Sequence, residues 1–224
     1  MLRRVLTCAV GVGVVVLAAA CSPVKMGAAA IVGSDRITVT QLDDQVSAFN
    51  QVYPKYASEV NLASSKVPGE VLSWLIRFRI RERMAQNAGI TVTPAQEQAA
   101  ITAINASGQQ YAEESGVSNY TLNLLLVANG LPPDLLNELG RYQAIETAYI
   151  EQLNGGKLPT STTEQNAATA ALNKFQCSTA KSLSIQVNPQ FGQFNYSQYS
   201  VASTPDTLSV ASGSKAATAS AGSC

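Results

Sequence analysis

Residues that could carry out catalysis are few in this chain, and their spacing is unsuitable. The sequence contains no histidine, which excludes a histidine general base, a Ser-His-Asp triad and a histidine metal site. Asp43–Asp44 and Glu113–Glu114 are adjacent pairs, and neighbours on a helix point in different directions, so neither pair can share a proton. Without histidine a serine nucleophile would need a lysine base, for which Lys66 beside Ser64–Ser65 is the nearest candidate and a weak one. We therefore expect a protein that is not an enzyme and that holds no cofactor and no metal.

Cys21 is a residue for which the sequence predicts a defined covalent reaction. Two arginines precede an apolar run over residues 5–17, and small residues then lead to the cysteine, as in a secretory signal. The run is shorter than the ~20 apolar residues of a membrane span. Leu17–Cys21 resembles a bacterial lipobox, in which the thiol receives a diacylglyceryl group, although Ala18 stands where such boxes usually carry leucine. We expect lipidation at Cys21; the alternative is an ordinary cleaved signal followed by a chance cysteine.

A lipid on Cys21 would tether the mature protein to a membrane. Each buried methylene contributes ~0.8 kcal/mol, so two acyl chains form a lasting anchor. Residues 1–20 are then a signal peptide and residues 21–28 a lipidated tether, with the remainder on the extracytoplasmic face of the cell membrane. Loss of the leader leaves 13 basic and 15 acidic residues, a net charge of about −2, which argues against nucleic acid as a partner. We expect no small-molecule substrate either.

Cys177 and Cys224 are the cysteines that remain after Cys8 leaves with the signal and Cys21 carries lipid. An even pair in an oxidising compartment favours a disulfide. The bond would close a loop of about 46 residues and would contribute ~3–4 kcal/mol in the chain-entropy model. Two free thiols, or a dimer linked through Cys224, are the alternatives.

The order of apolar patterns and turn residues predicts a mainly α-helical domain over residues 29–199, with two or three short β-strands. A strand, a turn and a second strand are expected over residues 28–39, and another strand at 183–187. Helices are expected at 40–53, 70–88, 94–111, 120–127, 132–153 and 161–175. Residues 200–224 are rich in Ser, Ala, Thr and Gly, which predicts a disordered low-complexity tail.

Local motifs predict where several of these helices begin and end. Thr40 is the expected N-cap of the first helix, Thr93 begins a capping box with proline at the next position, and Ser161 begins another. Gly89 is the expected end of the 70–88 helix. Four arginines between residues 77 and 83 are expected to form a solvated face whose stems cover apolar surface, rather than an anion site.

Two segments carry a resemblance to a known family. Ala29–Asp43 resembles the opening of SurA-type chaperone N-domains, and Leu72–Thr93 is similar to the helix-Gly-Ile-x-Val-Thr passage of SurA, PrsA and related foldases. The resemblance extends to Leu153 and implies a SurA N-terminal-like fold that binds unfolded secreted polypeptides. Many members carry a parvulin isomerase domain before a C-terminal helix. Here only about eight residues, Gly155–Thr162, separate the two helices, so the resemblance implies a non-catalytic member.

The expected function is therefore that of a membrane-anchored chaperone (holdase) for unfolded or partly folded secreted polypeptides. Such a protein offers an adaptable apolar groove, and tyrosine combines apolar area with a polar tip. The candidate client-binding residues are Tyr53, Tyr56, Tyr111, Tyr120 and Tyr142. Half-buried packing is the alternative for each of them. A structural or scaffolding lipoprotein that docks a folded envelope partner is the alternative function, which a flat surface patch rather than a concave one would favour.

Overall fold

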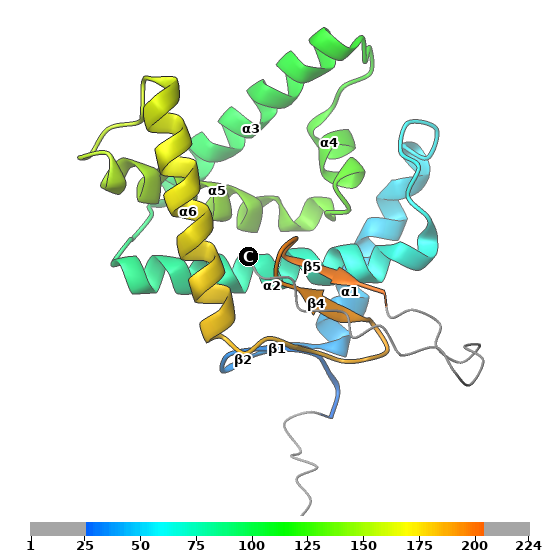
Figure 1. Cartoon of the computed structure of the whole chain (residues 1–224). Coiled ribbons are helices and arrows are strands. Elements are labelled where there is room, and N and C mark those ends of the chain that lie inside the picture. The colour runs from blue at the N-terminus through cyan, green and yellow to red at the C-terminus, as the bar shows by residue number, and fades with distance from the viewer. Residues whose placement is uncertain (1–25, 204–224) are drawn as a thin grey trace, which may run out of the picture.

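The computed structural model describes residues 26–203, which form a mainly helical fold with a few short strands, as the sequence predicts (Figure 1). The helices of this part of the chain are α1 (Val39–Val52), α2 (Val67–Ala88), α3 (Pro94–Ser115), α4 (Leu122–Ala128), α5 (Leu136–Leu153) and α6 (Thr162–Ser182). Short 3-10 turns, η2 (Tyr53–Lys55), η3 (Ser64–Lys66) and η4 (Pro133–Leu135), precede or follow them. Cys21, the predicted signal peptide and Cys224 lie outside the described residues.

Two small antiparallel sheets join distant parts of the chain. β1 (Ala28–Val32) lies between β2 (Asp35–Thr38) and β3 (Gln186–Val187). The first described strand therefore pairs with a strand that follows α6, the last described helix. β4 (Gln193–Asn195) and β5 (Ser200–Ala202) form a separate hairpin. This hairpin is absent from the sequence-based expectation, and β5 lies inside the segment predicted to be a tail.

The main core surrounds α2, which buries ten of its 22 residues. Leu42 and Phe49 of α1 pack with Leu72 and Ile76 of α2, and all four side chains are fully buried. Four partly buried aromatic residues after β3 pack against this core: Phe191, Phe194, Tyr196 and Tyr199. Apolar burial of this extent is the main favourable term in folding, so α2 is the helix on which the rest of the fold depends.

α3 and α4 form an arch above α5, on the opposite side of α2 from β1 and β2 (Figure 1). α3 is as long as α2, yet it buries only four residues. Its first half packs closely on α5, because Gly140 has no side chain where one would collide with it. A Cβ at Gly140 would lie 2.6 Å from Ile101 Cγ1. The C-terminal half of α3 rises away from α5.

Helix capping agrees with the sequence at two of three predicted starts. Thr93 and Ser161 form capping boxes with Gln96 and Glu164. The prediction for the first helix is wrong: Thr38, not Thr40, is the N-cap. Thr38 ends β2 with extended backbone, and this geometry lets its hydroxyl accept from a backbone N–H of the first turn. α2 ends at left-handed Gly89 as predicted, and α6 continues past Phe175 to Ser182.

Candidate binding groove

Two of the five candidate tyrosines stabilise the loop after α1. The half-buried Tyr53 donates its hydroxyl toward the carbonyl oxygens of Val60 and Leu62, each at 3.0 Å. Tyr56 is also half-buried, and its hydroxyl accepts a hydrogen bond of 3.3 Å from Thr121 Oγ1. The packing alternative therefore describes both residues, and neither lies on an open apolar surface.

Tyr142 packs inside the interface between α2 and α5. Its ring lies edge-on to Trp74 at 6.1 Å and to Phe78 at 6.0 Å, measured between ring centroids. The guanidinium of Arg81 lies 4.1 Å from the Tyr142 centroid, a cation–π arrangement. The position of Tyr142 therefore also matches the packing alternative.

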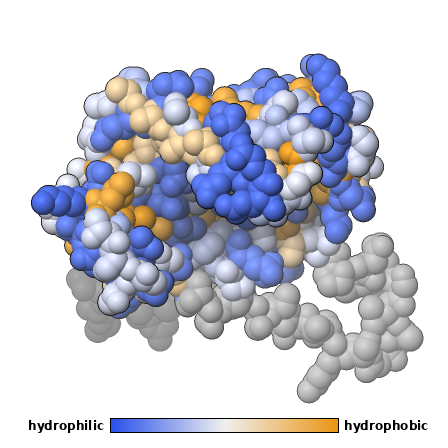
Figure 2. Space-filling model, turned by 90° about the horizontal axis from the view of Figure 1, so that it is seen from above, coloured by the Kyte–Doolittle hydropathy of each residue, from blue (hydrophilic) through white to orange (hydrophobic). Residues whose placement is uncertain are grey.

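Tyr111 and Tyr120 lie beside a groove of about 430 Å³ between α3, α4 and α5. The groove is lined by Ala103, Ile104, Ser107, Gly108, Tyr111, Leu125 and Gln143. Figure 2 views the molecule from above and shows apolar patches set among hydrophilic surface on this upper side. Tyr111 is 69% exposed. The helical spacing of Tyr111 with Ile101 and Ile104 predicts an inward orientation, which is wrong because the exposed side chain of Tyr111 lies at the groove.

Gly108 and Tyr120 fix the wall of the groove where the chain returns from α3 toward α4. A Cβ at Gly108 would lie 2.3 Å from the Tyr120 hydroxyl oxygen, so only glycine permits this approach. The Tyr120 hydroxyl lies 3.3 Å from both the carbonyl and the side-chain oxygen of Asn105. Burial raises the pKa of the Tyr120 phenol. A glycine inside a helical pattern was the sequence signal for this close approach.

Leu125 of α4 faces the groove from the opposite side. The short helix begins at Thr121, whose hydroxyl accepts a 3.1 Å hydrogen bond from the Leu124 backbone N–H. Its side chains at Leu124, Leu126 and Val127 are buried, whereas Leu125 is only half-buried. The apolar sequence of α4 thus serves two surfaces, one in the interior and one in the groove.

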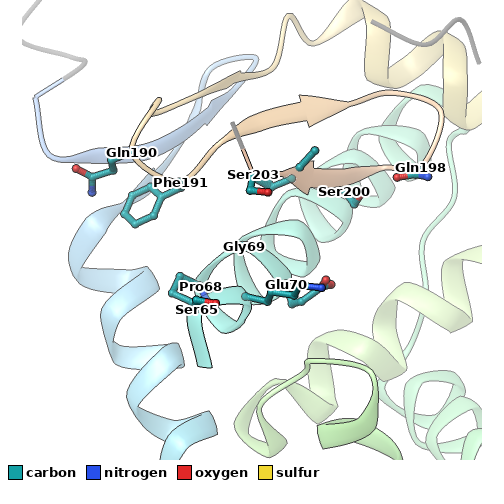
Figure 3. A pocket seen from close by; sticks show the side chains of 12 residues that line it. Ser65, Pro68, Gly69, Glu70, Gln190, Phe191, Gln198, Ser200 and Ser203 are labelled. Carbon is teal, nitrogen blue, oxygen red and sulfur yellow. The ribbon is translucent and has the colours of Figure 1, made fainter. Parts of the chain in front are cut away.

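A larger hollow of about 720 Å³ lies between the start of α2 and the end of β5 (Figure 3). Figure 3 shows Ser65, Pro68 and Glu70 on one side and Ser200 and Ser203 on the other. Most of its lining is small or polar, and Lys66 makes no hydrogen bond to a serine among residues 26–203. The same residues contain no group of three or more His, Cys, Asp or Glu side chains placed to hold a metal. We therefore take the α3–α4–α5 groove as the candidate site, and the absence of enzyme activity stays a prediction.

The arginines of α2 differ from the predicted solvated face. Arg81 is 2% exposed and forms an ion pair of 2.8 Å with Glu146 of α5 and a 3.3 Å hydrogen bond to Gln176 of α6. Arg77 donates from Nε to the Tyr199 carbonyl oxygen at 2.8 Å, and burial lowers the pKa of this guanidinium. The prediction is wrong for Arg81 because α5 and α6 cover its side of α2.

Cys177 lies half-buried on α6 and is disulfide-bonded. Cys224 lies outside the described residues, so the Cys177–Cys224 pairing stays a prediction, as does lipidation at Cys21. Within residues 26–203, no helix has the length and apolar character needed to cross a membrane.

Comparison with known proteins finds no matching family model, no match among curated proteins and no match among solved structures. The likeness of residues Ala29–Leu153 to SurA-type N-domains therefore stays a prediction from the sequence.

Proposed function

We propose that this protein is a membrane-anchored, extracytoplasmic chaperone that holds unfolded secreted polypeptides without catalysing a reaction. The observation that supports it best is the α3–α4–α5 groove, in which Ile104, Tyr111 and Leu125 keep apolar surface in contact with water. Covering such surface with an apolar client side chain is favourable by ~25 cal/mol per Å². The sequence resemblance to SurA-type domains points to the same function.

The composition of the groove suits a client without a fixed sequence. Ala103 and Ser107 contribute only small side chains, so they impose no particular shape on the occupant. Gln143 brings an amide, which can both donate to and accept from a peptide backbone. Apolar contact supplies affinity in such a site, and loose geometry allows many partners.

The position of the groove relative to the predicted tether is consistent with this role. The described chain begins beside β1, on the opposite side of α2 from the arch of α3 and α4 (Figure 1). A protein anchored through its N-terminal end would then present the groove away from its attachment point. Such an orientation leaves the groove accessible to polypeptides that leave the membrane.

Light scattering of a refolding, aggregation-prone client tests the proposal. The mature chain (residues 21–224), purified from a bacterial membrane fraction in zwitterionic nanodiscs, is added without nucleotide. We expect suppression near stoichiometric ratios, a several-fold weaker effect for Leu125→Asn, and wild-type suppression for Leu153→Asn. Leu153 is a matched control because it is 47% exposed but lies outside the groove.

Failure of the wild-type chain to suppress aggregation of several unrelated clients would overturn the holdase function. The scaffolding alternative would then lead. Circular dichroism of both variants verifies that a lost effect does not come from unfolding.

A further inference from the structure

The part of the chain that supplies the α3 and α4 sides of the groove carries charged side chains of one sign. From Met84 to Gly140 the sequence has five carboxylates and no lysine or arginine, although the whole chain has 15 acidic and 15 basic residues. This stretch includes all of α3 and α4. The basic residues of the protein are therefore concentrated in other elements, four of them in α2.

Two of these carboxylates lie at the end of α3 that borders the groove. Glu114 follows Tyr111 by three residues and Ser107 by seven, which places it on the groove-lining face of the helix. Glu113 is its exposed neighbour. α3 ends at Ser115, and the C-terminal end of a helix adds partial negative charge to that of the two side chains.

No cation among residues 26–203 neutralises this pair of carboxylates through an ion pair. The salt bridges of this part of the chain join Arg81 to Glu146, and Arg141 to Glu82 and Glu97. Arg141 of α5 lies 2.5 Å from a Glu82 carboxylate oxygen and 2.8 Å from one of Glu97, and the hydrogen bonds that it donates to Glu82 and then to Glu97 raise its pKa. Its charge is thus already compensated, and the rim of the groove stays anionic.

We infer that the groove prefers client segments in which apolar residues are flanked by lysine or arginine. This inference rests on the proposed function. The apolar lining receives the apolar side chains, while Glu113 and Glu114 attract cations within the ~10 Å over which charge acts at 0.1 M salt. Complementary charge of this kind speeds association and excludes partners of like charge. Acidic segments are therefore disfavoured at the same site.

Fluorescence anisotropy of three labelled peptides tests the inference. The peptides share one apolar core and are flanked by lysine, by serine or by glutamate, and empty nanodiscs supply the blank for the mature chain. At low salt we expect the lysine-flanked peptide to bind about tenfold more tightly than the glutamate-flanked one, and the gap to close at high salt. A Glu113→Gln/Glu114→Gln variant should lose this preference and still bind the serine-flanked peptide.

Asp43→Asn/Asp44→Asn is the matched control, because it removes an adjacent exposed acidic pair from α1, which does not line the groove. It should keep the wild-type preference. Equal binding of the three peptides, a preference for the glutamate-flanked peptide, or a preference that survives loss of Glu113 and Glu114 would each overturn the inference while leaving the chaperone proposal in place. Failure of all three peptides to bind would instead count against the groove as a client site.

Discussion

Two helices of equal length, α2 and α3, are used in opposite ways. Each has 22 residues, but α2 buries ten of them and α3 buries four. α2 carries four arginines, one of them fully enclosed, whereas α3 contains no basic residue. The difference indicates that α2 serves stability, while the outer half of α3 leaves apolar and acidic side chains available to a partner.

The neighbours of the two helices explain this difference. α2 is surrounded by α1, α5, α6 and β5, and Ser73 of α2 accepts a 2.8 Å hydrogen bond from the Val201 backbone N–H of β5. α3 is held mainly by α5 and lies beside the short α4 (Figure 1). Substitutions in α2 should therefore change unfolding, and those on the groove face of α3 should change binding.

The largest expected effect is a difference in the free energy of unfolding when isoleucine is replaced by alanine in α2 or in α3. Ile76→Ala in α2 removes a fully buried side chain and should lower the free energy of unfolding by about 3 kcal/mol. Ile104→Ala in α3 truncates a half-buried groove residue and should cost less than about 1 kcal/mol. Urea denaturation of the mature chain measures both. Equal losses would show that α3 is as much a core helix as α2.

Glycine substitutions provide a second comparison. Gly140→Ala would place a Cβ 2.6 Å from Ile101 and 3.0 Å from the Glu97 carbonyl oxygen. The strain of ~1–3 kcal/mol should exceed the gain of up to ~1 kcal/mol from better helix propensity. Gly69→Ala in α2 meets only the Val201 carbonyl oxygen, at 3.7 Å, and should not destabilise. Thermal unfolding of the two variants would contradict this account if Gly69→Ala proved the more damaging.

Removal of the N-cap side chain should have a smaller effect on stability, and here α3 should lose more than α2. Thr93 caps α3 through its side chain, whereas Lys66 at the start of α2 makes no side-chain cap. Thr93→Ala should cost about 1 kcal/mol, because a backbone N–H of the first turn loses its acceptor. Lys66→Ala should stay within ~0.5 kcal/mol of wild type. A larger loss for Lys66→Ala in urea denaturation would mean that α2, too, depends on the side chain of its N-cap residue.

The smallest expected effect lies outside both helices, at the start of α6. Hydrogen bonds from the backbone N–H groups of Ser161 and Thr160 lower the pKa of Glu164 from its ordinary value of 4.5. A depressed carboxyl pKa stabilises the fold above the ordinary value, and this contribution disappears as the pH falls through the folded-state pKa. The stability difference between wild type and Glu164→Gln should therefore shrink on acidification below pH 4.5. A difference that stays constant in acid would mean that the capping charge does not matter.

Local chemistry made two helix starts and one helix end predictable, whereas long-range contacts were not visible in the sequence. The capping boxes at Thr93 and Ser161 and the left-handed Gly89 depend on residues within one turn. The burial of Arg81 depends on Glu146 and Gln176, which lie far along the chain, so no local pattern indicated it. The same reason applies to the β4–β5 hairpin, which α2 stabilises.

The groove was only partly predictable. Tyr111 was identified as a candidate because of its residue type, but its helical spacing suggested the interior. The opposite wall, Leu125, is one apolar residue in an apolar helix, and nothing in that short sequence separates it from its buried neighbours. A more informative signal for the groove is the absence of lysine and arginine from Met84 to Gly140, because every charged side chain of α3 is then negative and α4 has none.

Site-specific photo-crosslinking tests the central claim, that clients bind between α3 and α4, most directly. A photoreactive phenylalanine analogue replaces Tyr111 in one variant and Leu153 in another, and each is irradiated with an unfolded secreted client. Both side chains are exposed, so a probe at either position can reach a client in solution. We predict a client adduct from position 111 and little from position 153. Equal adducts at the two positions, or none at position 111, would contradict the account.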